Sequence, residues 1–260
     1  MRSLLVVDAP ARWRILAALL ADIGHVTIAT GNGQVGPKTT RSSTSVSLPS
    51  DLNGWKAILM CAETVVHVGP SSQLAMLVEA LASASARPQV LVAIASIACD
   101  APVVELVAER AARPGLRVCC ARVGAWVGED CGLIRALLPL YRCFVGLREQ
   151  ADDRPISWCH HYDVARAVVF AVQSPEMAGP FDLVTPEPSR VQDLDLAISD
   201  ALGQRPVLRA SIATASRLIG QRLGQELALG SERYPEVLAR RGFAFVFSDI
   251  RSAVSDVLAD

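Results

Sequence analysis

Short apolar runs rich in β-branched residues alternate with longer amphipathic stretches along the first half of the chain. This alternation is typical of a parallel β-sheet whose strands are joined by crossover helices. In the stretch Ser71–Ser83, for example, the apolar residues share one helical face. We therefore predict strands at Leu4–Val7, His25–Ala29, Ala57–Cys61, Gln89–Ala95 and Leu116–Val123, and helices at Ala11–Asp22, Ser71–Ser83, Pro102–Ala112 and Leu133–Cys143.

The second half continues this pattern and then becomes mainly helical from Ser189. The predicted fold class is α/β, with a Rossmann-like doubly wound parallel sheet in residues 1–188 and a small, mainly helical C-terminal lobe in residues 189–260. The polar, Gly- and Ser-rich stretch Thr30–Asp51 is predicted to be a long surface loop with little regular structure. The further predicted elements are strands at Ile156–Cys159 and Phe181–Val184, and helices at Asp163–Gln173, Val191–Leu202, Ile212–Leu223, Glu232–Arg241 and Asp249–Leu258.

Composition narrows the classes of partner. With 260 residues, of which 51% are hydrophobic and 20% charged, the chain can build a large core. The net charge of −1 and the pI near 6.4 give no basic face, so no nucleic-acid partner is expected. No apolar run reaches the length of about 20 residues that a membrane span needs, and we expect a cytoplasmic protein. The seven cysteines show no C-x-x-C spacing, so we expect reduced thiols and no metal site.

Several motifs of the second half occur together in one known family. The segments Pro155-Ile-Ser-Trp-Cys-His-His-Tyr-Asp163 and Gly179-Pro-Phe-Asp-Leu-Val-Thr-Pro186 are followed by Arg205-Pro206 and Arg240-Arg-Gly-Phe-Ala-Phe245. In this order they resemble the extended short-chain dehydrogenase/reductases, and more narrowly their bacterial sugar-nucleotide-epimerase-like branch. The resemblance implies an NAD(P)-binding Rossmann domain at 1–188 and a substrate-binding cap at 189–260. It also implies a glycine loop, a basic residue after the second strand, and a Ser with a Tyr-x-x-x-Lys pair.

The first βα turn departs from that family pattern. The three family glycines fall on Val7, Pro10 and Trp13, of which Pro10 also lacks an amide donor. Our hypothesis is that the Asp8 carboxylate caps the following helix in place of a bound phosphate. The alternative hypothesis is that the guanidinium group of Arg12 or Arg14 binds a phosphate. The residues of this degenerate cofactor loop are Asp8, Pro10, Arg12, Trp13 and Arg14, and the family's basic position after the second strand falls on Gly31.

The catalytic pair of the family is also missing, because none of the tyrosines at 141, 162 and 234 has a Lys four residues later. The remaining catalytic candidates are Ser96, His160, Tyr162 and Asp163. A structural interpretation is favoured for two of them: His160 as a buried, hydrogen-bonded residue at a strand end, and Asp163 as the N-cap of the next helix. Adjacent histidines on a strand face opposite ways, which argues against His160 and His161 sharing a metal.

These departures lead to an expectation and two alternatives. The expectation is a degenerate, non-catalytic family member without a cofactor, a pseudoenzyme that acts as a binding, assembly or regulatory subunit. Its partner would be another protein or a second copy of itself, with a small molecule in the cleft as a further option. The first alternative is an NAD(P)-dependent oxidoreductase or epimerase with an unorthodox cofactor loop. The second is a cofactor-independent lyase, isomerase or cyclase that uses the old substrate cleft.

Overall fold

A computed structural model describes residues 1–7, 13–30, 43–83, 88–98, 100–128, 132–148, 155–220 and 232–259. The chain divides into two compact units, each formed from several segments. Unit 1 contains Met1–Ala95, Asp100–Arg122 and Ala165–Phe181, and unit 2 contains Ser96–Cys99, Val123–Val164 and Asp182–Asp260. The predicted division after residue 188 differs from these units, because Val123–Val164 groups with the C-terminal segment. The limits of independent domains therefore stay a prediction.

A seven-stranded sheet with the strand order β10-β6-β5-β4-β1-β2-β3 forms the centre of the fold. In sequence order it contains β1 (Arg2–Val7), β2 (His25–Thr30), β3 (Ser43–Ser47), β4 (Thr64–Val68), β5 (Val90–Ser96), β6 (Arg117–Val123) and β10 (Gly179–Leu183). Strand β1 pairs in parallel with β2 and β4, and the outer pairs β2–β3 and β4–β5 are also parallel. The order reverses between β1 and β4, which is the arrangement of a Rossmann-like α/β sheet. The predicted fold class is confirmed.

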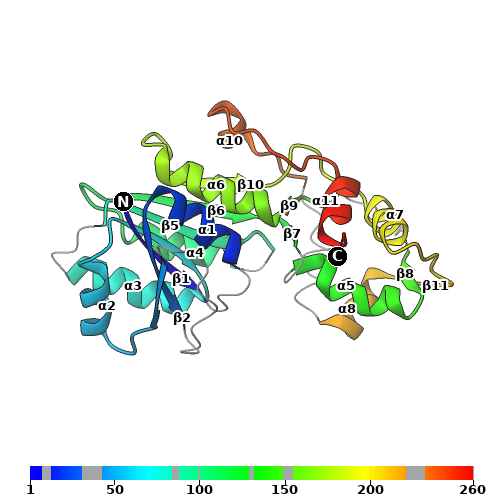
Figure 1. Cartoon of the computed structure of the whole chain (residues 1–260), viewed down its shortest axis with the longest axis horizontal. Coiled ribbons are helices and arrows are strands. Elements are labelled where there is room, and N and C mark those ends of the chain that lie inside the picture. Colours follow the sequence, from blue (N-terminus) through cyan, green and yellow to red (C-terminus); the bar gives the residue numbers. More distant parts are fainter. Residues whose placement is uncertain are drawn as a thin grey trace. The chain divides into compact units, whose positions relative to one another are not determined.

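Helices cover both faces of this sheet (Figure 1). Helices α2 (Leu52–Leu59), α3 (Ser71–Ser83) and α4 (Ala101–Glu109) lie on one face, and α1 (Arg14–Ile23) and α6 (His161–Gln173) lie on the other. Leu74, Leu77 and Leu81 follow the helical period in α3 and are buried against β1, β4 and β5. The predicted helix at Ser71–Ser83 is therefore confirmed with both ends.

The predicted strand at Ala57–Cys61 is wrong, because this run belongs to helix α2 and the turn after it. Asp51 begins the helix by accepting a hydrogen bond from the backbone N–H of Gly54 at 2.7 Å. Trp55 and Leu59, four residues apart, are then buried on one helical face. The strand is instead the next apolar run, β4, in which all five residues are buried.

The predicted loop Thr30–Asp51 also contains regular structure that was not expected. Strand β3 pairs with β2 along the whole length of β3, from Ser43 opposite Val26 to Ser47 opposite Thr30. Its polar residues suit an edge strand with one exposed face, which apolar periodicity does not detect. The remaining predicted strands and helices of the sheet region are confirmed with ends shifted by a few residues. Residues 11 and 12 of the predicted helix Ala11–Asp22 lie outside the described residues.

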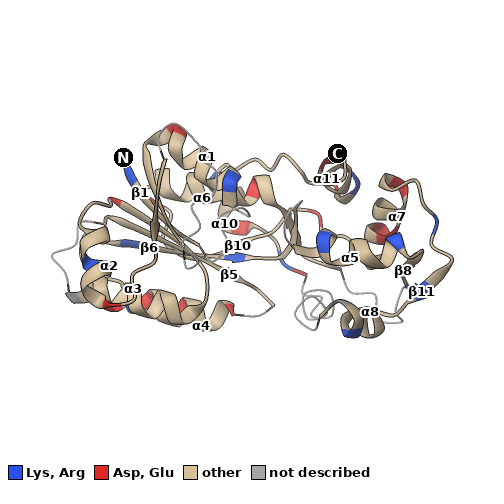
Figure 2. Cartoon of the chain, turned by 60° about the horizontal axis from the view of Figure 1, so that its bottom comes forward, with Lys and Arg blue, Asp and Glu red and all other residues tan. Residues whose placement is uncertain are grey.

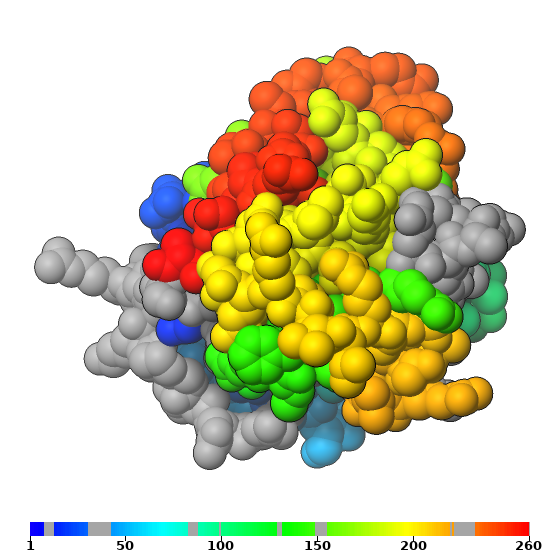
Figure 3. Space-filling view, turned by 90° about the vertical axis from the view of Figure 1, so that its right-hand side faces the viewer, coloured from blue at the N-terminus to red at the C-terminus, as the bar shows by residue number. Residues whose placement is uncertain are grey.

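Unit 2 has its own apolar core and two short parallel strand pairs. The pairs are β7 (Ala125–Val127) with β9 (Trp158–His160), and β8 (Val145–Leu147) with β11 (Leu208–Ala210). Helices α7 (Val191–Ala201, yellow) and α11 (Ile250–Val257, red) lie side by side in Figure 3 and bury apolar residues in the same core. The predicted C-terminal helices are present but shorter than expected, since α8 ends at Ile219 and α10 begins at Glu236. In the described part of this unit, the helices that lie wholly within it are α5 (Gly132–Arg142), α7 (Val191–Ala201), α8 (Ile212–Ile219), α10 (Glu236–Arg240) and α11 (Ile250–Val257).

Asp195 of α7 links four elements of unit 2. Its buried carboxylate accepts hydrogen bonds from the Tyr141 hydroxyl at 2.7 Å, from the Leu147 backbone N–H at 2.8 Å and from the Arg209 guanidinium. Burial and the neighbouring carboxylate raise the pKa of Tyr141 well above its ordinary value. The Tyr141 hydroxyl therefore stays protonated and remains a donor to Asp195.

Basic and acidic residues are interspersed along the described elements (Figure 2). In the part of the chain that the structure describes, no helix combines the length and the low polarity that a bilayer span requires. The absence of a nucleic-acid partner and the cytoplasmic location stay predictions.

Candidate functional site

The first βα turn leads from a fully buried strand into a helix with an indole at its start. Val7, at the first family glycine position, is buried at the end of β1. Trp13, at the third, is 6% exposed and forms the N-cap position of α1 without capping it through its side chain. Arg14 is exposed. The described residues do not include Asp8, Pro10, Arg12 or Gly31. Helix capping by Asp8 and phosphate binding by Arg12 or Arg14 therefore stay predictions.

Ligands of open α/β sheets bind at the carboxyl ends of the strands, where the strand order reverses. In unit 1 this edge contains the last residues of β1, β2 and β4 and the first turn of α3. Buried polar side-chain atoms without a hydrogen-bond partner lie on three residues here: Thr30 Oγ1 at the end of β2, both ring nitrogens of His67 on β4, and Gln73 Oε1 on α3. Such atoms are uncommon in native interiors and require an explanation.

His67 is the most enclosed of these residues. It is 0% exposed, and its register partners are Val6 on β1 and Ala93 on β5, which pack in the core with α2, α3 and α4. Burial lowers the pKa of His67 from its ordinary value of 6.5 to about 4. The imidazole is therefore neutral at pH 7 and offers one donor and one acceptor. His67 was not among the residues expected from the sequence, although a histidine inside the apolar run Thr64–Val68 indicates a buried polar group.

Gly69 separates His67 from Gln73 and leaves room for a polar group. A Cβ at Gly69 would lie 2.6 Å from Gln73 Oε1 and 3.5 Å from His67 Nε2. The carboxamide of Gln73 thus occupies the space that a side chain at 69 would fill. A residue other than glycine would push it away, so the turn between β4 and α3 is built around this carboxamide.

The second candidate region is the junction of β9 and α6 in unit 2. The sequence predicted that His160 and His161 face opposite ways on a strand, and this is wrong. Strand β9 ends at His160 and α6 begins at His161, which brings the two rings to a centroid separation of 4.4 Å. The ring of His160 also stacks against Phe247, with centroids 3.8 Å apart.

His160 is confirmed as a buried, hydrogen-bonded residue at a strand end. Its Nδ1 accepts a hydrogen bond from the Tyr162 backbone N–H at 3.3 Å, which assigns the proton to Nε2, 3.4 Å from Asp256 Oδ2. Burial, and to a smaller extent the neighbouring His161, lowers the pKa of His160 to about 3. The imidazole is therefore neutral, and its contact with Asp256 is not an ion pair at pH 7.

Asp163 does not cap α6, as the sequence predicted, because the helix begins two residues earlier. The carboxylate instead accepts hydrogen bonds from the backbone N–H groups of Val246, at 3.0 and 3.1 Å, and Phe247, at 2.8 Å. Asp163 is 0% exposed. It therefore fastens the first turn of α6 to a segment more than 80 residues away.

The catalytic candidates remain predictions, and the structure places them on two elements. Ser96 is the last residue of β5 and is half-buried, whereas His160, Tyr162 and Asp163 are neighbours at the β9–α6 junction. Tyr162 is half-buried in the first turn of α6. Among the described residues, no group of three or more His, Cys, Asp or Glu side chains is arranged to hold a metal ion.

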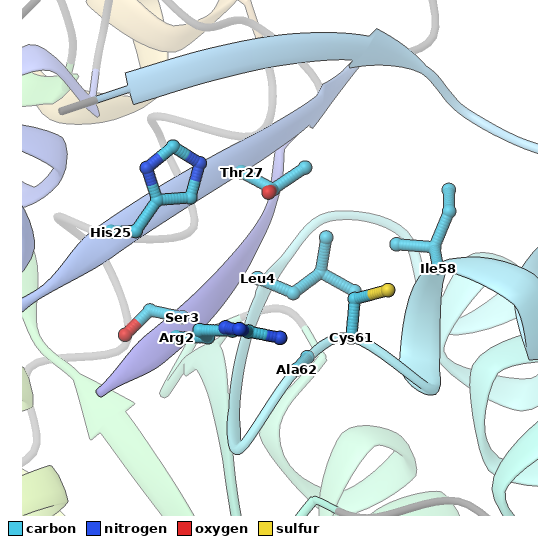
Figure 4. A pocket seen from close by; sticks show the side chains of 8 residues that line it. All are labelled: Arg2, Ser3, Leu4, His25, Thr27, Ile58, Cys61 and Ala62. Carbon is cyan, nitrogen blue, oxygen red and sulfur yellow. The ribbon is translucent and has the colours of Figure 1, made fainter.

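A pocket of about 250 Å³ lies in unit 1 at the opposite edge of the sheet (Figure 4). It is formed at the amino ends of β1 and β2 by Arg2, His25 and Thr27, with Ile58 and Cys61 from the α2 side. Figure 4 shows the side chains of Arg2 and Cys61 on the same side of this hollow. Ligands of an open α/β sheet bind at the carboxyl ends of its strands, whereas this pocket lies at the amino ends. We therefore do not assign the candidate site to this pocket.

Comparisons with known proteins identify similar chains. The chain is 30% identical over 151 residues to an epimerase family protein of Mycobacterium bovis, an alignment that covers 56% of this chain and 50% of the relative. The chain thus matches about half the length of this curated relative. No family model matches the chain.

Two solved structures share the fold over nearly their whole length. A human epimerase family protein solved with NADPH has a TM-score of 0.80 at 17% identity and covers 100% of both chains. An enzyme of Bordetella bronchiseptica in complex with NAD⁺ has a TM-score of 0.74 at 13% identity, covering 100% of this chain and 98% of the other.

The expectation of a non-catalytic pseudoenzyme subunit is wrong in the light of these comparisons. The sequence relatives are named epimerase family proteins, and similar structures were solved with NADPH or NAD⁺. The expectation that no cofactor binds is likewise unsupported. The replaced glycines and the missing Tyr-x-x-x-Lys pair do not by themselves show a loss of function, because neither excludes cofactor contacts from other parts of the sheet edge.

The chain is thus similar in sequence to epimerase family proteins over about half of its length, and it shares its fold with solved structures of an epimerase family protein and of an enzyme in complex with NAD⁺.

Proposed function

We propose that this protein is an NAD(P)-dependent epimerase or oxidoreductase that acts on a hydroxyl-bearing carbon of a sugar-nucleotide substrate. The observation that carries the proposal is the group of unpartnered polar atoms of Thr30, His67 and Gln73 at the carboxyl edge of the sheet. The similarity to epimerase family proteins, one of them solved with NADPH, supports the same reading. The substrate class follows from the resemblance alone.

The residues at this edge fit the neutral portions of a dinucleotide. Thr30 provides a hydroxyl, His67 a neutral imidazole and Gln73 an amide oxygen, so the edge offers both donors and acceptors. The phosphate-binding part of the first turn, by contrast, lacks the family glycines at positions 7, 10 and 13.

Bound NAD(P) supplies hydride transfer at the reacting carbon. The protein must then move the hydroxyl proton of that carbon through a side chain within hydrogen-bond reach. His160 is a poor candidate, since its Nδ1 is occupied by the Tyr162 N–H and its low pKa keeps it neutral. Asp163 is occupied by two backbone amides. Ser96 and Tyr162 are therefore the residues that we propose for proton transfer.

The proposal is tested by titrating the full chain with NADH and NADPH while following nicotinamide fluorescence. We expect saturable binding in the range of about 1 µM to 1 mM that is usual for enzyme ligands. A linear response for both nucleotides up to several times that range would overturn the cofactor assignment. Turnover is tested separately by NMR of a sugar nucleotide incubated with protein and NAD⁺, compared with Tyr162→Phe and Ser96→Ala.

A further inference from the structure

Two surface segments of unit 2 meet at the strand pair β8–β11 (Figure 1). The Phe144 carbonyl oxygen accepts hydrogen bonds from the backbone N–H groups of Val207, at 2.9 Å, and Leu208, at 3.1 Å. The side chains of Phe144, Val207 and Leu208 are nevertheless 49%, 80% and 65% exposed. Together with the exposed residues Arg142 and Arg205, which precede them in the two segments, we call them the β8–β11 patch.

Phe144 has a conformation that folding alone does not explain. Among the described residues it is the one non-glycine residue with a positive φ, 58°. It lies two residues after the end of α5, at a position where glycine is usual because it adopts positive φ without strain. An aromatic side chain here strains the backbone and, being half-exposed, buries little apolar surface in return. This combination favours a role for the ring outside the folded chain.

The patch carries positive charge, although the whole chain has a formal net charge of only −1. The two segments, residues 142–148 and 205–210, contain no acidic residue. Asp195 pairs with Arg209 from below, which leaves the other arginines of the segments as unneutralised charges. All four arginines are exposed: Arg142, Arg148, Arg205 and Arg209. The patch thus combines projecting apolar side chains with cationic ones.

This combination discriminates between classes of partner. A nucleic acid would pair with the arginines but would give the aliphatic side chains of Val207 and Leu208 little apolar contact. A second copy, paired symmetrically, would bring the same arginines against each other. Side chains that project this far suit a soft medium, such as the boundary between lipid headgroups and acyl chains, and anionic headgroups attract the arginines.

We propose that the β8–β11 patch docks the protein on an anionic lipid surface. Phe144, Val207 and Leu208 enter the headgroup region, and Arg142 and Arg205 pair with the anionic headgroups. Such docking is peripheral and needs no helix that crosses the bilayer. It is also independent of the proposed cofactor and reaction, because none of these residues belongs to the carboxyl edge of the central sheet.

The test is sedimentation of the full chain with vesicles of phosphatidylglycerol and phosphatidylcholine, compared with vesicles of phosphatidylcholine alone. We expect the anionic vesicles to bind at least about tenfold more strongly at low salt, and the binding to weaken as salt is added. Phe144→Gly removes the ring and relaxes the positive φ. It should lower the affinity for the anionic vesicles at least about tenfold, while the melting temperature stays the same or rises.

Val207→Ser has a matched control in Val103→Ser, the same exchange at a 52% exposed position of α4. The variant at 207 should bind the anionic vesicles more weakly than the wild type, and the variant at 103 should bind them equally well. Arg205→Gln should lower the affinity about fivefold, the contribution of one cationic side chain near a charged membrane. The control for this change is Arg251→Gln at an exposed position of α11, which should leave the affinity unchanged.

Four results would overturn the proposal. The first is no binding to the anionic vesicles at low salt. The second is binding that Phe144→Gly and Val207→Ser leave unchanged, which assigns it to another surface. The third is binding to soluble polyglutamate but not to vesicles, lost in Arg205→Gln, which assigns the patch to an acidic protein. The fourth is a dimer in analytical ultracentrifugation that dissociates in Val207→Ser, without vesicle binding, which assigns the patch to a second copy.

Discussion

Replacing Asp163 by Ala tests whether this residue is part of the architecture or of the chemistry. Its buried carboxylate accepts hydrogen bonds from the backbone amides of Val246 and Phe247. Thr185 contacts the same segment, because its hydroxyl lies 3.3 Å from the carbonyl oxygen of Phe247 and 3.4 Å from that of Ser248, as a donor shared between the two. Truncation at 163 therefore removes the acceptor for two neighbouring N–H groups and leaves the Thr185 contacts in place.

The magnitude follows from the number of amides that lose their partner. Each buried donor that is left unsatisfied costs about 1–3 kcal/mol, so two amides give a loss of about 2–6 kcal/mol. The lower end applies if the segment moves enough for water to reach the amides. Since a domain of this size is stable by only about 5–15 kcal/mol, the expected loss is a large part of the total.

Urea unfolding followed by far-ultraviolet circular dichroism measures this loss. Asp163→Asn is the matched variant, because its amide oxygen still accepts from one of the two backbone donors, and we expect it to lose about half as much. A change in the midpoint at constant slope identifies a stability effect. An Asp163→Ala variant within about 0.5 kcal/mol of the wild type, the range of ordinary surface substitutions, would refute the reasoning.

Three further predictions concern other buried contacts. The free energy of unfolding falls as the pH drops below about 6.5, because burial lowers the pKa of His67 to about 4 and that of His160 to about 3, so the unfolded state binds protons first. Each histidine lowers the free energy of unfolding by up to about 1.4 kcal/mol for each unit by which the pH falls. Urea titrations at pH 7 and pH 5 should therefore show a smaller loss of stability between the two pH values for His160→Gln than for the wild type. Tyr141→Phe removes the hydroxyl that donates to Asp195 and should cost about 1.5–3 kcal/mol in chemical denaturation, whereas Tyr234→Phe at an exposed position should be nearly neutral. Arg117→Met retains the apolar stem but loses the donors to the carbonyl oxygens of Ala171 and Val172 in the last turn of α6 and of Met177 beyond it, so its melting temperature should fall by several degrees. An unchanged melting temperature would contradict the capping role.

The apolar pattern predicted most of the central sheet because most of its strands, such as β1, β4 and β5, are compact apolar runs that contain β-branched residues. It failed where two such runs follow each other, at Ala57–Cys61 and Thr64–Val68. The first run became helical through the cap at Asp51 and the four-residue spacing of Trp55 and Leu59. The three-residue strands of unit 2 are too short to show any period, and their pairing depends on contacts distant in sequence.

The candidate site was less accessible to sequence reasoning than the fold. Placing the start of α6 two residues too late changed the expected direction of His161 and assigned a capping role to Asp163. The true partners of Asp163 are 83 and 84 residues away, and no local pattern encodes them. His67 could have been noticed as a polar residue in a buried strand, next to Gly69. That neither of its nitrogens has a partner is visible only in three dimensions.

The replaced glycines of the first turn and the polar atoms of the β4–α3 turn bear on different parts of the dinucleotide that we propose as the cofactor. The glycines of a Rossmann loop allow the backbone to approach the pyrophosphate and the helix to pack closely. Their replacement at positions 7 and 13, where Val7 and Trp13 are buried, removes that approach without touching the β4–α3 turn. Contacts from Thr30, His67 and Gln73 to the neutral parts of the dinucleotide, as proposed above, require neither the glycines nor a positive charge. A protein that binds its dinucleotide in this way would depend less on phosphate contacts, so its cofactor affinity should vary less with ionic strength than that of a relative with the glycine loop.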